Sequence, residues 1–255
     1  MNILILKLVL APVVIGSASL AGRKWGPAVS GWIVGLPLTS GPVIFFLALS
    51  HDVTFAANGA LGVISGGISL VAYTLSYVWL AKKFGWQGAL TGSLLVFMTC
   101  TAILQNFTIP LIPIFLIVCG LILIALRVMP TDEAEDGNAQ PGPWDIPARI
   151  LIGTSFILLL TGIAPFIGPH LTGLLTTIPL YVSILTVFAH RHQGSAAAAH
   201  ILRGLLYGLF AFAGFFFTLN LLLERSGIAI AFISAIIVAL TIQGATLWIL
   251  QQTRQ

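Results

Sequence analysis

Two stretches of the sequence decide the fold: residues 26–38 are GPAVSGWIVGLPL, and residues 168–180 are GPHLTGLLTTIPL. Both follow the pattern G-P-x-x-[ST]-G-x-x-x-x-x-P-L, and they lie 142 positions apart. The same offset relates further pairs: Lys7 to Arg149, Asn58 to His200, Gly62 to Gly204, Gly66 to Gly208 and Gly85 to Gly227. A constant register over most of the chain indicates an internal duplication.

The composition is that of a membrane protein. Of the 255 residues, 58% are hydrophobic and 7% are charged, against about 25% charged in an ordinary soluble domain. Mean hydropathy is +1.06. Too few polar groups remain to cover a soluble surface, which excludes a soluble enzyme, a nucleic-acid binder and a disordered chain. The first expected partner is therefore the lipid bilayer.

A membrane-spanning helix needs about 20 mostly apolar residues, and nine stretches qualify. They are approximately Ile3–Ala21, Val29–Leu49, Ala56–Leu80, Gly88–Leu104, Thr108–Val128, Ile146–Ile163, Leu171–Ala189, His200–Leu223 and Ile228–Leu250. The predicted fold class is an all-α polytopic membrane protein with nine transmembrane helices.

Loop charges predict the orientation, because cytoplasmic loops are enriched in Lys and Arg. With nine spans, nine basic residues fall on one side: Arg23, Lys24, Lys82, Lys83, Arg127, Arg149, Arg191, Arg203 and Arg254. Only Lys7 and Arg225 fall on the other side. The amino terminus is therefore expected outside and the carboxyl terminus in the cytoplasm.

The duplication and the span count together predict an inverted repeat. Residues 1–106 form a first four-helix repeat, 107–129 a linking helix, 130–145 an acidic cytoplasmic loop, and 146–255 a second four-helix repeat. The acidic loop holds five of the seven Asp and Glu residues. Because one span separates the repeats, the second is inverted relative to the first, a 4+1+4 plan frequent in secondary transporters.

The second and seventh spans are interrupted by proline, which removes a backbone hydrogen bond inside a helix. In hydrocarbon the freed carbonyls need partners, from nearby hydroxyls or a water-filled cavity. Paired interruptions in two halves point to a transporter binding site; ordinary proline kinks are the alternative. The candidate substrate-binding residues here are Pro37, Thr39, Ser40, Thr176, Thr177 and Pro179.

Three further candidates lie at the start of the third and eighth spans. Asn58 and His200 are equivalent positions, and Arg203 lies one turn after His200. Together His200 and Arg203 could bind an anionic group; the alternative is that Arg203 anchors its span at the cytoplasmic side. Lys7 and Arg149 have two possible roles. They could form a paired cationic site for an anion, or their side chains could extend to the nearest membrane interface. The pairs Gly62/Gly66 and Gly204/Gly208 predict close helix packing.

Tyrosines and one asparagine inside the spans are expected to pack or to lie at the interface, with cavity lining as the alternative. They are Tyr73, Tyr77, Tyr181 and Asn220.

No Asp or Glu lies within any predicted span, so coupling of transport through an intramembrane carboxylate is disfavoured. The sequence also lacks a metal-ligand motif, a nucleophile elbow and paired carboxylates. Cys100 and Cys119 lie in apolar runs without metal-binding spacing. We therefore expect no enzyme activity, no metal and no cofactor.

The stretch 171–179, LTGLLTTIP, followed by a helix, a short loop at Gln193-Gly194 and a glycine-containing helix, resembles small inner-membrane proteins of the GlpM type. Proteins of that type are similar to a single four-span unit. By this resemblance, the chain is an inverted tandem duplication of such a unit. The resemblance implies a bacterial inner membrane and an association with exopolysaccharide (alginate) production.

The leading hypothesis is a transporter or permease for a small solute, which could be anionic, with its pathway between the repeats. The alternative is a non-transporting accessory of cell-envelope or exopolysaccharide production. The sequence also leaves a homodimer open. A polar cavity beside Pro37 and Pro179 is the structural feature that transport requires, whereas a close-packed bundle there would contradict it.

Overall fold

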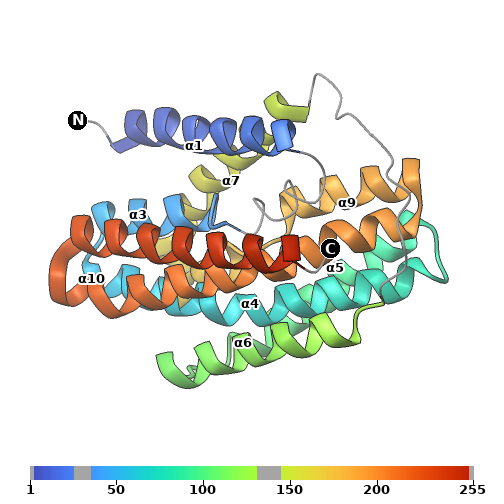
Figure 1. Cartoon of the computed structure of the whole chain (residues 1–255). Coiled ribbons are helices and arrows are strands. Elements are labelled where there is room, and N and C mark those ends of the chain that lie inside the picture. Colours follow the sequence, from blue (N-terminus) through green and yellow to red (C-terminus); the bar gives the residue numbers. More distant parts are fainter. Residues whose placement is uncertain (1–2, 26–35, 131–144, 253–255) are drawn as a thin grey trace.

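The computed structural model describes residues 3–25, 36–130 and 145–252, and the regular structure of these ranges is entirely helical (Figure 1). The helices are α1 (Ile3–Trp25), α3 (Ser40–Ser50), α4 (Val53–Ala81), α5 (Trp86–Leu104), α6 (Leu111–Val128), α7 (Asp145–Ile167), α8 (Pro169–Leu175), α9 (Leu180–Gln193) and α10 (Ser195–Gln252). The predicted all-α class is therefore confirmed. Most of the acidic loop and the first part of the second predicted span lie outside the described residues.

Six helical stretches among the described residues are long and apolar enough to cross a membrane. Large apolar side chains cover the outside of the bundle: Leu95 of α5 is 68% exposed and Ile112 of α6 is 63% exposed. A water-soluble protein rarely exposes such continuous apolar surface, whereas lipid tails solvate it. These features are those of a helical membrane protein.

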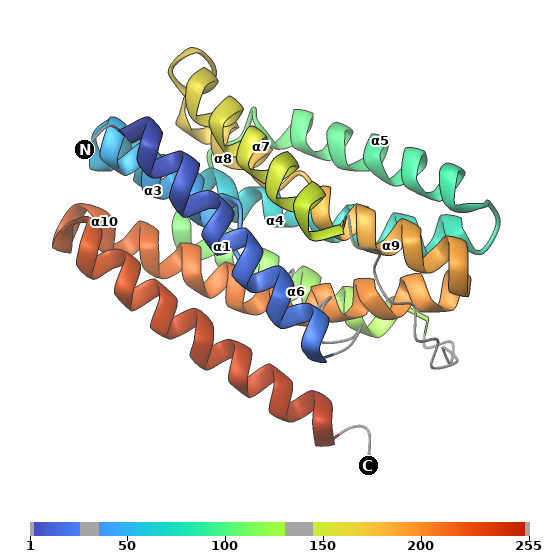
Figure 2. The ribbon, with the colours of Figure 1, turned by 90° about the horizontal axis from the view of Figure 1, so that it is seen from above.

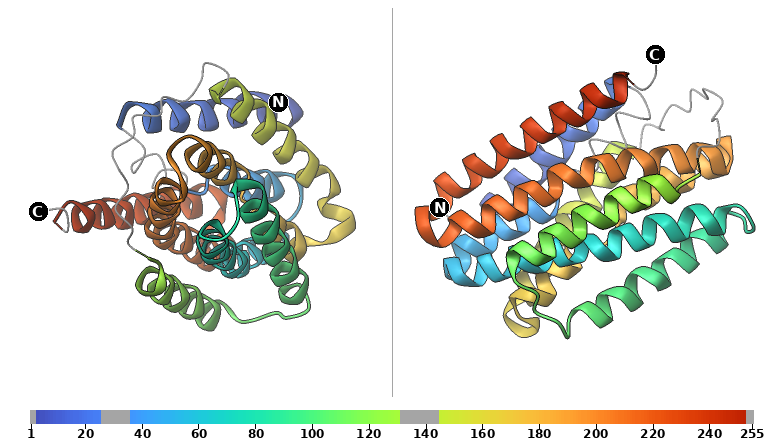
Figure 3. Two further views of the ribbon diagram at one scale, coloured as in Figure 1. Left: turned by 90° about the vertical axis from the view of Figure 1, so that its right-hand side faces the viewer. Right: turned by 60° about the horizontal axis from the view of Figure 1, so that its bottom comes forward.

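Helix α4 lies at the centre of the bundle, packed by α5, α6, α8 and the first part of α10 (Figure 3). Its side chains are buried along nearly its whole length, and Tyr73 and Tyr77 are fully buried. Asp52 begins the helix: its carboxylate accepts a hydrogen bond from the backbone N–H of Phe55 at 2.6 Å. This N-cap places the carboxylate at a helix end, outside the apolar interior.

Helices α1 and α7 run antiparallel on one side of the bundle (Figure 2). The Nζ of Lys7 in α1 donates a hydrogen bond to Oγ1 of Thr161 in α7 at 2.9 Å. The same amine lies 5.6 Å from the ring centroid of Phe46 in α3. The two helices are thus joined by a polar contact as well as by apolar packing.

Helix α10 contains both of the last two predicted spans. It bends back on itself at Gly227, which has φ 78° and ψ 172°, and the two legs lie side by side (Figure 1). Gly214 of the first leg faces the side chains of Val238 and Ile242 of the second. Only a glycine adopts this backbone conformation without strain, so the chain reverses direction there without a separate loop.

The described basic loop residues gather at one end of the bundle (Figure 3). Lys82 and Lys83 follow the end of α4, Arg127 lies in the last turn of α6, and Arg191 lies in the last turn of α9. The opposite end carries Arg225 beside the bend of α10.

Candidate functional site

The helix containing Pro179 is broken in two. Helix α8 ends at Leu175 and α9 begins at Leu180, with Pro179 as its N-cap. Pro179 has no backbone N–H and its ring clashes with the preceding turn, so a continuous helix is disfavoured through this point. The chain crosses the break in an irregular segment, residues 176–179, deep inside the bundle.

A second interruption lies opposite the first. Residues 36–39, which include Pro37, precede α3, and α3 begins at Ser40. The backbone N–H of Leu38 bonds to the carbonyl of Leu36 at 2.7 Å, and that of Gly41 bonds to the carbonyl of Pro37 at 2.9 Å. These bonds hold a tight turn immediately before the helix.

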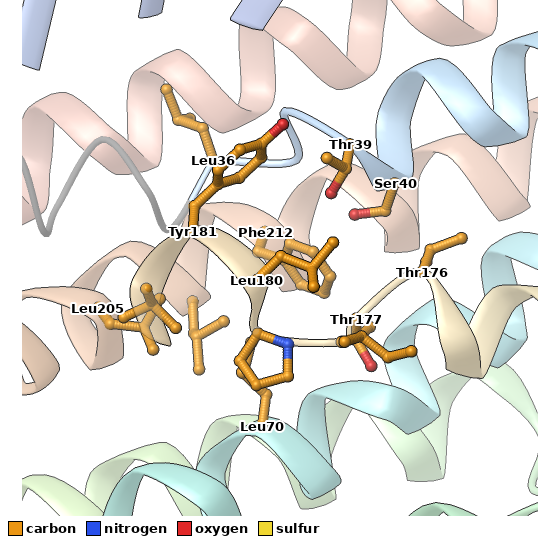
Figure 4. A pocket seen from close by; sticks show the side chains of 14 residues that line it. Leu36, Thr39, Ser40, Leu70, Thr176, Thr177, Leu180, Tyr181, Leu205 and Phe212 are labelled. Atoms are coloured by element: carbon orange, nitrogen blue, oxygen red, sulfur yellow. The ribbon is translucent and has the colours of Figure 1, made fainter. Parts of the chain in front are cut away.

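A cavity of about 50 Å³ lies between the two interruptions (Figure 4). Its walls combine both irregular segments with α4 and the first leg of α10. The lining residues are Leu36, Thr39, Ser40, Leu70, Thr176, Thr177, Ile178, Pro179, Leu180, Tyr181, Val182, Leu205, Leu209 and Phe212. Five of the candidate residues, Thr39, Ser40, Thr176, Thr177 and Pro179, thus line one cavity, whereas Pro37 is not among its lining residues.

The hydroxyls of Thr176 and Thr177 donate hydrogen bonds to carbonyls in the last turn of α8. Thr176 Oγ1 donates to the carbonyl of Gly173 at 2.7 Å, and Thr177 Oγ1 donates to the carbonyl of Leu174 at 2.6 Å. The last carbonyls of a helix have no partner within it, and these side chains supply one. The sequence expectation that nearby hydroxyls satisfy freed carbonyls is confirmed for this pair.

The hydroxyls of Thr39 and Ser40 behave differently. Neither has a hydrogen-bond partner among the described residues, although Ser40 is only 3% exposed. In Figure 4 both oxygens point into the space between the two segments. A hydroxyl that faces a cavity without a protein partner can donate to, or accept from, a water or a ligand there.

Glycines let the broken helix approach α4 closely. A Cβ on Gly62 would overlap the carbonyl oxygen of His170, and a Cβ on Gly173 would overlap the carbonyl oxygen of Gly59. The expected close approach of Gly62 and Gly66 is therefore present, and its partner is α8. Their counterparts Gly204 and Gly208 lie in the first leg of α10, where Gly208 is buried.

The remaining candidates do not line the cavity. Asn58 and His200 are exposed. Arg203 is half-buried, and its Nη1 has no hydrogen-bond acceptor within the part of the chain that the structure describes. Lys7 is held by Thr161, and Arg149 is buried where its carbonyl accepts a hydrogen bond from the Tyr181 hydroxyl at 3.0 Å.

Most of the polar residues of the spans contribute to packing. The hydroxyl of Tyr73 pairs with that of Ser183 at 2.8 Å, and Tyr77 pairs with Nδ1 of His190 at 3.3 Å. Asn220 donates to the carbonyl of Ala57 at 2.7 Å. Of the four residues weighed for this role, only Tyr181 lines the cavity.

Sequence reasoning missed the apolar wall of the cavity. Leu205, Leu209 and Phe212 share one face of α10 at helical spacing, and Leu70 faces them from α4. Such a face is also the signature of ordinary core packing, so the pattern alone did not distinguish it.

Comparisons of the chain with protein-family models, curated proteins and solved structures gave no match. Among the described residues, no three His, Cys, Asp or Glu side chains group so as to hold a metal ion. The arrangement offers hydroxyls, helix ends and apolar walls, which are groups that can bind a small solute.

Proposed function

We propose that this chain is a small-solute transporter or permease of a bacterial inner membrane, whose pathway runs through the cavity between the two interrupted helices. The observation that carries the proposal is the cavity itself. It is lined by Thr39 and Ser40 from one copy of the duplicated sequence pattern and by Thr176, Thr177 and Pro179 from the other. Irregular backbone at membrane depth is tolerated where it lines a cavity.

The depth of the cavity supports this proposal. Leu70 lies near the middle of α4, and Leu209 lies near the middle of the first leg of α10. Substrate sites of transporters built from internal repeats lie near the bilayer midplane, at discontinuous helices.

The proposed topology has nine spans in a 4+1+4 inverted arrangement. In it α1, α3, α4 and α5 belong to the first repeat, α6 is the linking helix, and α7, α8–α9 and the two legs of α10 form the second repeat. Two observations support it: the antiparallel run of α1 and α7 and the basic residues gathered at one end of the bundle. That end is proposed to be cytoplasmic.

The size of the cavity constrains the mechanism. A volume of about 50 Å³ holds one small group or one to two waters. In the proposed mechanism this arrangement is a closed state of the pathway, and passage requires the interrupted segments 36–39 and 176–179 to move.

The proposal is tested with the purified chain in liposomes, by measuring the uptake of a panel of small labelled solutes. Leu209→Trp fills the cavity and is expected to lower the initial rate at least about tenfold, because even about 1.4 kcal/mol of obstruction has that effect. Leu240→Trp is the matched control, since Leu240 is 59% exposed on the second leg of α10; it should leave the rate unchanged.

Two results would contradict the proposal, the first by removing transport and the second by removing the cavity from the pathway. The first is that the wild-type vesicles move no solute in the panel while deletion of the gene alters exopolysaccharide output, which favours the accessory role. The second is that Leu209→Trp transports at the wild-type rate, which removes the cavity from the pathway.

A further inference from the structure

Two helices point their amino ends at the cavity from opposite sides. Helix α3 begins at Ser40 and α9 begins at Leu180, and both residues line the cavity. From the cavity the two helices run away in opposite directions (Figure 4). Each amino end carries a partial positive charge of about half an elementary charge, so the two fields add in the space between them.

Several backbone donors at both helix ends have no acceptor among the described residues. Within the described residues no acceptor is found for the N–H groups of Thr39 and Ser40, or for those of Tyr181 and Val182. The first N–H groups of a helix have no partner within it and need a side chain, water or a ligand. Neither helix has a side-chain cap or an acidic residue in its first turn.

An independent observation on a side chain points to the same ligand. The Ser40 residue is only 3% exposed, and its hydroxyl has no partner among the described residues. Its oxygen is directed into the cavity (Figure 4). Thr39 adds a second hydroxyl beside it, which makes no cap hydrogen bond to α3. Both can donate to a group placed between the two helix ends.

The opposing negative helix end is already neutralised. The carbonyls of Gly173, Leu174 and Leu175 at the end of α8 accept hydrogen bonds from the residues that follow, including both threonine hydroxyls. None of the described residues that line the cavity is Asp or Glu. Hydrogen-bond donors are therefore in excess, which selects against cations.

We infer that this cavity binds one small monovalent anion, such as chloride or the carboxylate group of a small acid, between the amino ends of α3 and α9. This inference rests on the proposed function only in placing the anion on the solute pathway. None of the described lining residues is Lys or Arg. The attraction that they provide therefore comes from helix ends and hydroxyls, and it suits a single charge. The volume of about 50 Å³ excludes a sugar or a nucleotide.

Binding is tested with the full chain in detergent, in gluconate buffer, by titrating chloride in one arm and formate in another while the melting temperature is followed. Saturable stabilisation by at least one of the two is expected. Ser40→Ala removes a donor and should weaken the apparent affinity about tenfold or more, because hydrogen bonds to charged groups exceed about 1.4 kcal/mol. Ser40→Asp places a negative charge at the site and should abolish the response.

The control is Ser17→Ala, whose serine is exposed on α1 and whose substitution should leave the titration unchanged. The inference is overturned if neither anion stabilises the wild-type protein. It is also overturned if both Ser40 variants fold and are stabilised as much as the wild type. If vesicles carry a neutral or cationic solute that neither anion competes with, the inference fails and transport stands. If the anion binds through Ser40 but no solute moves, transport fails and the inference stands.

Discussion

Gly66 of α4 lies directly against Thr177, one of the residues that line the cavity at the helix break. A Cβ placed on Gly66 would come within 2.5 Å of Thr177 Oγ1 and 2.7 Å of its Cγ2. Thr177 is held in place by its own hydrogen bond to Leu174. The shape of the cavity therefore depends on the absence of a side chain on the neighbouring helix.

Gly66→Ala should push Thr177 toward the cavity. Overpacking of this kind costs about 1–3 kcal/mol, which lowers the melting temperature by about 2–4 °C per kcal/mol for a chain of this size. Solute uptake should fall by more than the loss of folded protein explains. The matched control is Gly120→Ala in α6, because a Cβ there meets nothing within 4 Å. If the two variants have the same melting temperature and the same uptake rate, the contact between Gly66 and Thr177 does not determine the shape of the cavity.

Gly173→Ala should destabilise the protein more than Gly66→Ala does. The added Cβ would meet the backbone carbonyl of Gly59 and, at 2.8 Å, the backbone N of Val63. Backbone atoms in two packed helices cannot rotate away, so a cost of about 3 kcal/mol or more is expected. The melting temperature in detergent is the measurement, with Gly162→Ala as the control because its site is open. A variant that melts with the wild type would contradict the close approach of α8 to α4.

The general architecture could be predicted from sequence because its cause is local. Long apolar runs must form helices in lipid, since every backbone polar group has to be satisfied internally. Proline likewise locates a helix break without tertiary information, and α9 begins immediately after Pro179. Successive spans cross in opposite directions, so the sequence also predicts that Lys82 and Arg191 lie at the same end of the bundle.

The candidate site was predictable only in part, because side-chain direction depends on tertiary packing. Thr176 and Ser40 are both hydroxyl residues beside a proline interruption, so the sequence alone predicts the same role for both. In the structure, the Thr176 hydroxyl bonds to the end of its own helix, whereas the Ser40 hydroxyl is directed into the cavity. His200 has the chemistry of a ligand but faces outward. The contact between Lys7 and Thr161 joins positions 154 residues apart, a pairing that no local pattern indicates.

That contact predicts a measurable coupling. Thr161→Val leaves the half-buried Lys7 ammonium without its acceptor and should destabilise the protein by about 1–3 kcal/mol. Lys7→Met combined with Thr161→Val removes both partners and should recover most of that loss. A double-mutant cycle on thermal stability gives the coupling energy, expected at about 1 kcal/mol or more. Strictly additive effects would show that the contact contributes nothing.

The proposed orientation predicts which helix ends are reached from outside the cell. In a chain with Cys100 and Cys119 replaced by alanine, Lys82→Cys should react with a membrane-impermeant maleimide only after the cells are opened, because it follows α4 at the basic end. Arg225→Cys, exposed beside the bend of α10, is the matched control and should react in intact cells. The reverse pattern would invert the topology, because cytoplasmic loops are the ones enriched in Lys and Arg.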